Sequence, residues 1–385
     1  MSLSVCLLTR DEEKNLARAL QSVAGLADEV VVADTGSTDQ TVRIATRLGA
    51  RVVPYAWDDD FAAARDFALA QARSDWILWL NPDEEVSRET FVHLREGMTR
   101  QDVAGFYVLV QDQLRPDEPD ACSESAQLRV LRRGLPLRSA GRLHPVFVPT
   151  VEEAAAAQGK QVPYVATVLR RHAYLSQLNE AKLRWSLRLL ELELRDRPGR
   201  LPYLIEYGKT LLLANDSRGH EVLAEAVEQV LVARRAAAPP SPAVQRLFEY
   251  LLTVDPAQSR SRLSREETRA LALRWFPTSP PLLWQIALQH FQANEFQHAA
   301  RLLEKLVDLG KTGAYDHSEG FEPGIIGEPA LMNLAVCHLR LGDLDRAEAC
   351  FLQLMAGSKF RDKAAQNLVV VQTLRAQNMK RLTEE

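Results

Sequence analysis

The stretch WILWLNPDEE, residues Trp76–Glu85, joins five consecutive apolar residues to a polar end that carries three carboxylates. A short continuous apolar run predicts a strand buried on both faces, as in the interior of a parallel sheet. In an open α/β sheet, ligands bind at the carboxyl ends of such strands. Clustered carboxylates at that edge favour a hard divalent cation, although an ordinary acidic turn before a helix is the simpler alternative. The stretch therefore predicts an inner strand and a candidate metal site at its end.

The chain around this stretch repeats a strand-then-helix pattern roughly every 25 residues. Strands are expected at residues 3–9, 30–34, 51–55, 76–80, 105–110, 127–132 and 165–171. Helices are expected from about residue 12, near 41–48 and over 61–72. This alternation predicts the α/β class, with a Rossmann-like, mainly parallel sheet.

Four polar loops follow the first four strands and would converge on one edge of the sheet. They are Thr9-Arg10, Asp34-Thr35-Gly36-Ser37, Trp57-Asp58-Asp59-Asp60 and Asn81-Pro82-Asp83-Glu84. None contains GxGxxG or GxxxxGK[ST], so the site lacks the glycine cradle of dinucleotide-binding and P-loop proteins. Each loop alone could be turn chemistry, but four at one edge favour a ligand site. A diphosphate there would be held by a cation on carboxylates and by arginines.

All four loops carry a resemblance to family 2 nucleotide-sugar glycosyltransferases. TRDEEKNL (Thr9–Leu16) and VADTGSTD (Val32–Asp39) look like the opening of that family. WDDDFAAARD (Trp57–Asp66) is similar to the W-x-D-D-F-A-x-x-R-N motif of a branch that includes bacterial peptide glycosyltransferases with helical tails. The segment from Asn81 to Glu84 stands where the family has D-A-D-E, its DxD metal motif.

The resemblance implies a fold, a reaction and roles for individual residues. The implied fold is the glycosyltransferase A type, and the implied reaction is a metal-dependent, inverting transfer of a sugar, usually from a UDP-sugar with Mn²⁺ or Mg²⁺. The acceptor could be a peptide, a glycan or a lipid. The implied roles are uracil contacts for Thr9 and Asp34, base and ribose contacts for Glu12, a diphosphate contact for Arg65, a nucleotide contact for Asn81 and a metal bond for Asp83.

Two residues are candidates for the base that activates the acceptor, Asp60 and His144. His144 could instead ligate the metal as a neutral imidazole or form a hydrogen bond in the core. Nearby, Arg129, Arg132, Arg133, Arg138 and Arg142 form a basic run. Such a run is either a solvated face or the source of one or two arginines that reach the diphosphate.

Four positions depart from the family's motifs. Asn81 replaces the first Asp of DxD, Asp11 and Asp66 each replace an Asn, and Pro145 replaces the Glu of an R-I-H-E segment. If Asn81 is a lost metal-shell charge, Asn81→Asp would tighten Mn²⁺ binding. The same departures support an alternative function, in which a degenerate glycosyltransferase-like domain serves as a scaffold for the rest of the chain.

The second half of the chain shows helical periodicity and an internal repeat. Ala287, His290, Ala299 and Leu303 match Ala335, His338, Ala347 and Phe351 at one constant offset. This placement of small residues at helix crossings resembles that of tetratricopeptide repeats. The two histidines occupy equivalent positions and are expected in the core. We therefore predict a glycosyltransferase domain over 1–177 and a tetratricopeptide-like helical domain over 178–385, which would bind an acceptor or form a homodimer.

Net charge, cysteine spacing and the length of the apolar runs argue against several classes of protein. The 385 residues include 47 basic and 51 acidic ones, a net charge of −4 that favours neither nucleic acid nor an anionic membrane. The four cysteines form no CxxC pair, which is typical of free thiols in a reducing compartment. No apolar run approaches the ~20 residues of a membrane span. These features predict a cytoplasmic protein without a transmembrane segment.

Overall fold

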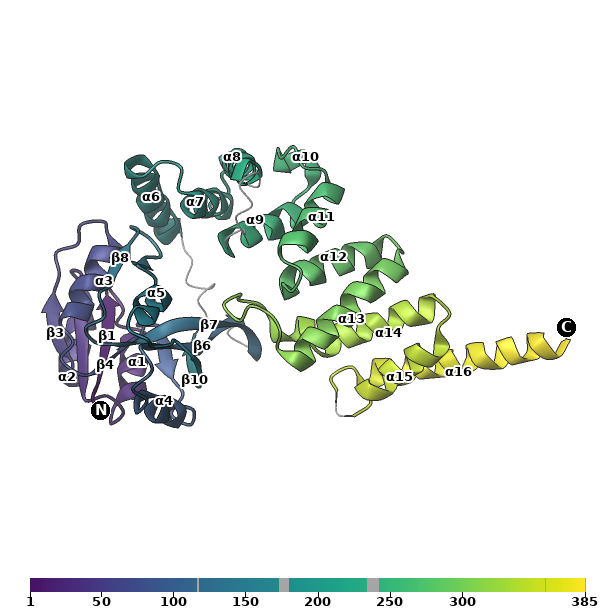
Figure 1. Cartoon of the computed structure of the whole chain (residues 1–385), viewed down its shortest axis with the longest axis horizontal. Coiled ribbons are helices and arrows are strands. Elements are labelled where there is room, and N and C mark those ends of the chain that lie inside the picture. The colour runs from purple at the N-terminus through teal and green to yellow at the C-terminus, as the bar shows by residue number, and fades with distance from the viewer. Residues whose placement is uncertain (116–117, 173–179, 234–241, 357, 385) are drawn as a thin grey trace. The chain divides into compact units, whose positions relative to one another are not determined.

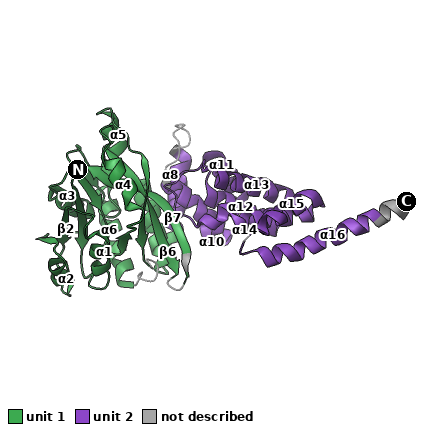
Figure 2. Ribbon diagram, turned by 90° about the horizontal axis from the view of Figure 1, so that it is seen from below, with its two compact units in different colours: residues 1–219 green, residues 220–385 purple. Residues whose placement is uncertain are grey.

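The computed structural model describes residues 1–115, 118–172, 180–233, 242–356 and 358–384. It divides into two compact units, Met1–Gly219 and His220–Glu385 (Figure 2). Within the first unit, an eight-stranded sheet occupies the centre (Figure 1). Its strands are β1 (Leu3–Thr9), β2 (Glu29–Asp34), β3 (Arg51–Pro54), β4 (Trp76–Trp79), β5 (Glu84–Val86), β6 (Gly105–Arg115), β7 (Glu118–Arg132) and β10 (Tyr164–Arg171).

The strand order is β3-β2-β1-β4-β7-β6-β10-β5. Strands β1 to β4 pair in parallel, whereas β7 and β5 run antiparallel to their neighbours. The expected α/β class with a mainly parallel sheet is confirmed. The opening stretch is indeed an inner strand, because β4 lies between β1 and β7 and Trp76 is fully buried. Strand β5 was not predicted, since three residues are too short to show a pattern.

Helices cover both faces of this sheet. The helices of the first unit are α1 (Leu16–Val23), α2 (Thr41–Arg47), α3 (Phe61–Ala70), α4 (Phe91–Met98), α5 (Val151–Ala156), α6 (Glu180–Asp196) and α7 (Leu201–Leu213). Apolar residues of α1 and α4 pack on one face with Val5 and Leu78. Their sequence neighbours Cys6 and Ile77 pack on the opposite face with Leu69 and Ala72, beside the end of α3. Burial on both faces explains why the strands read as continuous apolar runs.

The division between the units differs from the predicted boundary at 177/178, which lies outside the described residues. Helices α6 and α7 belong to the first unit because their apolar faces pack on the loops of the sheet. Leu189, Leu190 and Tyr203 form a cluster with Leu143. Trp185 of α6 lies 5.6 Å from Trp57, measured between ring centroids. The division therefore falls after Gly219, within α8 (Arg218–Ala233).

The second unit consists of helices, and consecutive helices from α12 onward pack against each other. They are α9 (Pro242–Thr253), α10 (Pro256–Ser259), α11 (Arg265–Trp275), α12 (Pro280–Gln292), α13 (Phe296–Thr312), α14 (Glu328–Arg340), α15 (Leu344–Leu354) and α16 (Arg361–Glu384), with a 3₁₀ turn η3 (Pro323–Ile326). The repeat is confirmed as two helical hairpins, α12–α13 and α14–α15, with Ala287, Ala335, Ala299 and Ala347 fully buried at their crossings. Among the described helices, none is both long and apolar enough to cross a membrane.

Candidate functional site

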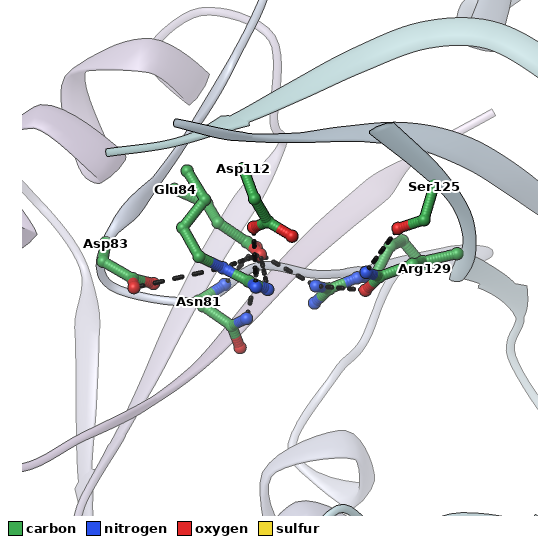
Figure 3. A network of polar contacts seen from close by, with 8 residues as sticks. Asn81, Asp83, Glu84, Asp112, Ser125 and Arg129 are labelled. Carbon is green, nitrogen blue, oxygen red and sulfur yellow. Dashed lines mark hydrogen bonds and ion pairs between the residues drawn. The ribbon is translucent and has the colours of Figure 1, made fainter. Parts of the chain in front are cut away.

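Glu84 is the centre of a charged cluster at the end of β4. Its carboxylate is fully buried and accepts Nη2 of Arg129 at 2.8 Å and Nη2 of Arg171 at 2.6 Å. Figure 3 shows it between Asn81 and Arg129. The cluster is assembled by strand pairing, since β5 and β10 place Glu84 directly opposite Arg171. Burial alone would raise the pKa of Glu84, but the two guanidiniums overcome this effect and lower it.

Two further carboxylates of the cluster are less well compensated. Among the described residues, Asp83 has only Nε of Arg171 as a cationic partner, at 4.0 Å. Burial and the neighbouring Glu84 raise the pKa of Asp83 to about 6, against the opposing effect of Arg171. Asp112 forms an ion pair with Nη1 of Arg171 at 2.8 Å, yet burial still raises its pKa. Within the described parts of the chain, three carboxylates thus face two guanidiniums, and this cluster is short of positive charge.

This charge deficit fits a divalent cation. Carboxylate oxygens are the ligands that Mn²⁺ and Mg²⁺ prefer. Asp83 and Asp112 have the raised pKa values expected of carboxylates that a cation would stabilise in the ionised form. The expected metal role of Asp83 agrees with this donor set and remains a prediction.

The side chain of Asn81 is a donor in this cluster. Its Nδ2 donates to Oε1 of Glu84 at 2.9 Å, and its backbone N–H donates to Oε2 at 2.9 Å. A carboxylate at this position could not donate and would repel Glu84. Asn81 therefore has a role as a donor to Glu84 that the sequence analysis did not assign, and its nucleotide contact and the effect of Asn81→Asp on Mn²⁺ remain predictions.

Arg65 presents a largely buried guanidinium beside this cluster. Its Nη1 donates to the carbonyl of Pro145 at 2.9 Å, and the guanidinium lies 4.0 Å from the centroid of the Phe147 ring. Its Nε is buried without a hydrogen-bond partner among the described residues. Burial and the nearby Arg129 lower the pKa of Arg65 to about 10. An arginine whose charged form is destabilised in this way is suited to bind an anionic ligand.

Thr9 and Asp34 meet at the ends of β1 and β2, as predicted from the parallel strands. The Thr9 hydroxyl donates to Oδ1 of Asp34 at 3.3 Å. Oδ2 of Asp34 accepts the backbone N–H groups of Gly36 and Ser37, each at 3.0 Å, and this turns the loop sharply. Asp34 therefore shapes the loop in addition to its predicted uracil contact. Glu12, half-buried, accepts Nδ2 of Asn15 at 2.9 Å and is close enough to raise the pKa of Asp83.

The WDDDF motif, Trp57–Phe61, caps the start of α3. Asp60 is the helix N-cap, and its Oδ1 accepts the N–H groups of Ala62 and Ala63 at 2.7 and 3.1 Å. Trp57 packs against Phe61 and Trp185, as expected of a packing residue. The cap gives Asp60 a structural role that the sequence analysis did not assign, and its role as a base remains a prediction.

His144 lies in the loop between β8 (Arg138–Ala140) and β9 (Val146–Val148). Its side chain is 66% exposed, with Nε2 3.9 Å from Oε1 of Glu206 on α7. A core position for His144 is therefore wrong, because the loop turns its ring toward solvent. The loop is anchored by Arg65 through Pro145 and by Asp66, which accepts the N–H of Ser139 at 3.0 Å. The metal and base roles of His144 remain predictions.

The basic run does not form one solvated face. Arg129 is 7% exposed and pairs with Glu84, whereas Arg132 stacks on Trp76 at 4.5 Å. Sequence reasoning offered Arg129 only as one of five arginines and missed Arg171 and Asp112 as site residues. An arginine at the end of a predicted strand, as Arg171 is, was the available signal.

Comparisons with known proteins agree with these motifs. Residues 4–141 match the family described as Glycosyl transferase family 2. A TPR repeat-containing protein of Synechococcus elongatus is 44% identical over 110 residues, which are 29% of this chain and 27% of that protein. An uncharacterized glycosyltransferase of Rickettsia typhi is 41% identical over 87 residues, 23% of this chain and 30% of that protein. The chain thus spans under a third of the length of these curated relatives.

Among solved structures, S. aureus TarS 1-349 overlaps 82% of this chain and 93% of its own, at 15% identity and a TM-score of 0.35.

Proposed function

With a glycosyl transferase family 2 domain in residues 4–141 as the premise, we propose that the protein transfers a sugar from a nucleotide donor to an acceptor. The observation that carries the proposal is the charge-deficient cluster around Glu84, at the carboxyl end of the central strand β4. A site short of positive charge beside a buried arginine is suited to a cation and a diphosphate together. We propose UDP as the nucleotide, from the resemblance of the first two loops.

Asp83 would hold a divalent ion, Mn²⁺ or Mg²⁺, with Glu12 contributing negative charge nearby and Asp112 sharing Arg171 with Asp83. Such an ion supplies charge neutralisation for a departing nucleoside diphosphate. Glu84 does not need to be a ligand in this proposal, because two arginines and the Asn81 amide already saturate it. Its role is to hold Arg129 and Arg171 in place, so that their guanidiniums do not move closer to Asp83.

Arg65 would bind the diphosphate. Its guanidinium is oriented by the Pro145 carbonyl and the Phe147 ring, and its Nε lacks a partner among the described residues. A phosphate oxygen would satisfy that N–H and restore the charge balance between Arg65 and Arg129. Thr9 and Asp34 would bind the base, where a uracil N–H would compete with the Ser37 hydroxyl, 2.5 Å from Oδ1 of Asp34.

The acceptor would be activated by Asp60 or His144. The Asp60 cap occupies Oδ1, which leaves Oδ2 to accept a proton. His144 is exposed and stands one residue from the Arg65 contact, so its imidazole could reach an incoming acceptor. Attack by the acceptor opposite the diphosphate would invert the anomeric carbon. Asp60→Asn and His144→Gln would show which residue is the base. The variant that lacks the base should lose sugar transfer and keep its affinity for UDP.

Calorimetry with UDP, in the presence and absence of Mn²⁺, tests the proposal. Metal-dependent UDP affinity that is lost in Asp83→Ala is the expected result. The matched control is Asp39→Ala, which removes a half-buried carboxylate of the second loop. If UDP does not bind with Mn²⁺, the domain is a scaffold and the helical unit carries the function. A panel of sugar nucleotides assayed for donor hydrolysis would then identify the sugar of an active enzyme.

The helical unit would select the acceptor, whether peptide, glycan or lipid, or form a homodimer, since stacked helical hairpins expose extended binding surfaces. All four cysteines are free thiols, which supports a cytoplasmic location.

A further inference from the structure

The turn between α12 and α13 brings together three side chains of types that can bind metals. His290 lies near the end of α12, Glu295 is the N-cap residue of α13, and His298 lies in its first turn. One ligand atom from each lies within 4.8 Å of those of the other two. Among the described residues, this is the one such group of three histidine, cysteine or acidic side chains.

The backbone of the turn fixes this arrangement. The N–H of Glu295 donates to the carbonyl of His290 at 2.9 Å, and the N–H of His298 donates to the carbonyl of Glu295 at 3.0 Å. Asn294 adopts a left-handed conformation at φ 60°, which reverses the chain between the helices. The three side chains therefore share one side of the hairpin.

The side chains already interact as potential ligands. Nδ1 of His290 lies 2.5 Å from Oε2 of Glu295, and the rings of His290 and His298 stack with centroids 5.3 Å apart. The group thus combines one carboxylate with two imidazoles, whose ligand atoms face one another across the turn.

The equivalent turn of the next repeat, between α14 and α15, carries different side chains. His338 and Asp343 are the equivalents of His290 and Glu295, but Arg346 stands where His298 does. Nε of Arg346 lies 3.4 Å from Oδ2 of Asp343. The second hairpin thus neutralises its carboxylate with a permanent cation, whereas the first hairpin offers a second imidazole. The nearby Arg269 adds positive charge to the first hairpin, and its Nε is held by Gln289 at 2.8 Å.

We propose that His290, Glu295 and His298 bind a late first-row divalent metal ion, with Zn²⁺ as the representative. Two imidazoles and a carboxylate form a nitrogen-rich set that suits Zn²⁺, in contrast to the oxygen ligands at the sheet edge. Tetrahedral ligands lie about 3.3 Å apart at ordinary zinc bond lengths, so the three atoms must shift by roughly 1 Å. Glu295 is 50% exposed and can move, whereas His290 is 16% exposed and provides the anchor. The fourth position remains open to water.

The test is titration of the full-length, metal-free protein with Zn²⁺ alone, without nucleotide. Calorimetry measures affinity and stoichiometry, and the visible spectrum of the Co²⁺ form reports nitrogen coordination. An Asp83→Ala background removes the ligand proposed at the sheet edge. We expect one Zn²⁺ per chain in this background, so the result does not depend on the proposed transferase function.

Two variants address the ligands. His298→Arg reproduces the residue of the second repeat, and Glu295→Gln removes the charge at nearly constant shape. Each should weaken Zn²⁺ affinity by at least about tenfold, since even an outer-shell partner of a metal is worth that factor. The matched control is His93→Arg, the same substitution at an exposed histidine on α4, which should leave affinity unchanged. Parent-like Zn²⁺ binding by both Glu295→Gln and His298→Arg, or an equal loss in His93→Arg, would overturn the proposal.

Discussion

Replacing Asn81 with aspartate tests the charged cluster most directly. The Asn81 Nδ2 donates to Oε1 of Glu84 at 2.9 Å, and Glu84 is fully buried. Asn81→Asp removes that donor and places a second carboxylate against the first. The family resemblance led to a separate expectation for the same substitution, a tighter metal site, which concerns Mn²⁺ affinity and not stability.

The size of the effect follows from two contributions. Loss of a hydrogen bond to an ionised group costs about 1.5–3 kcal/mol. Two like charges about 3 Å apart repel by roughly 5 kcal/mol at an effective dielectric constant of 20. Arg129 and Arg171 lie on the same carboxylate and offset part of this repulsion, and protonation of the new group relieves more. We expect the free energy of unfolding to fall by about 2–4 kcal/mol at pH 7.

The same substitution at Asn15 is the matched control. Nδ2 of Asn15 also donates to a glutamate three residues away, Oε2 of Glu12, at 2.9 Å. Glu12 is only half-buried, so water screens the new repulsion and Asn15→Asp should cost no more than about 1 kcal/mol. Urea unfolding of both variants and the parent, at pH 7 and pH 5, measures the difference.

The pH dependence provides a second check. The new carboxylate next to Glu84 would have a folded pKa above its unfolded value of about 4. Its penalty is therefore absent below pH 4 and develops as the pH rises through the folded pKa, so the loss should be smaller at pH 5 than at pH 7. If Asn81→Asp is as stable as the parent, or loses no more than Asn15→Asp, the Asn81–Glu84 contact is wrong.

Three further changes test other parts of the structure. The pKa of Asp83 is raised from 3.8 to about 6, so its ionisation destabilises the fold as the pH rises through about 6. Asp83→Asn should therefore raise the free energy of unfolding by up to about 3 kcal/mol at pH 7 and leave it unchanged below pH 4. Urea unfolding without metal measures this gain, and its absence would mean that Asp83 is solvated. Asp34→Ala should weaken UDP more than pyrophosphate in calorimetry, and equal losses would count against a base contact. In Gly141→Ala the new Cβ would lie 1.7 Å from the Tyr203 hydroxyl at φ +112°, whereas in Gly134→Ala it meets nothing within 4 Å at φ +88°. Thermal unfolding should show a clearly larger loss for Gly141→Ala, and equal losses would contradict the α7 packing.

The sequence by itself determined the features that local patterning encodes. Five apolar residues from Trp76 to Leu80 predict an inner strand, because a strand buried on both faces leaves no polar alternation. The regular return of strands predicts that Thr9 and Asp34 meet at one edge, and their hydroxyl and carboxylate do so at 3.3 Å. The constant offset between Ala287 and Ala335 likewise predicts the paired hairpins of the second unit, because helix crossings require small residues wherever they recur.

Tertiary structure decided what depends on pairing across long stretches of chain. Glu84 meets Arg129 and Arg171, which are 45 and 87 residues away, only because β5 turns back beside β10 and β7 inserts next to β4. Burial then shifts the pKa of Asp83, an effect that depends on the surrounding volume rather than on the neighbouring residues in sequence. The packing of α6 on the Trp57 loop is of the same kind. An apolar helix face shows in the sequence, but the surface that buries it is chosen only when the whole chain has folded.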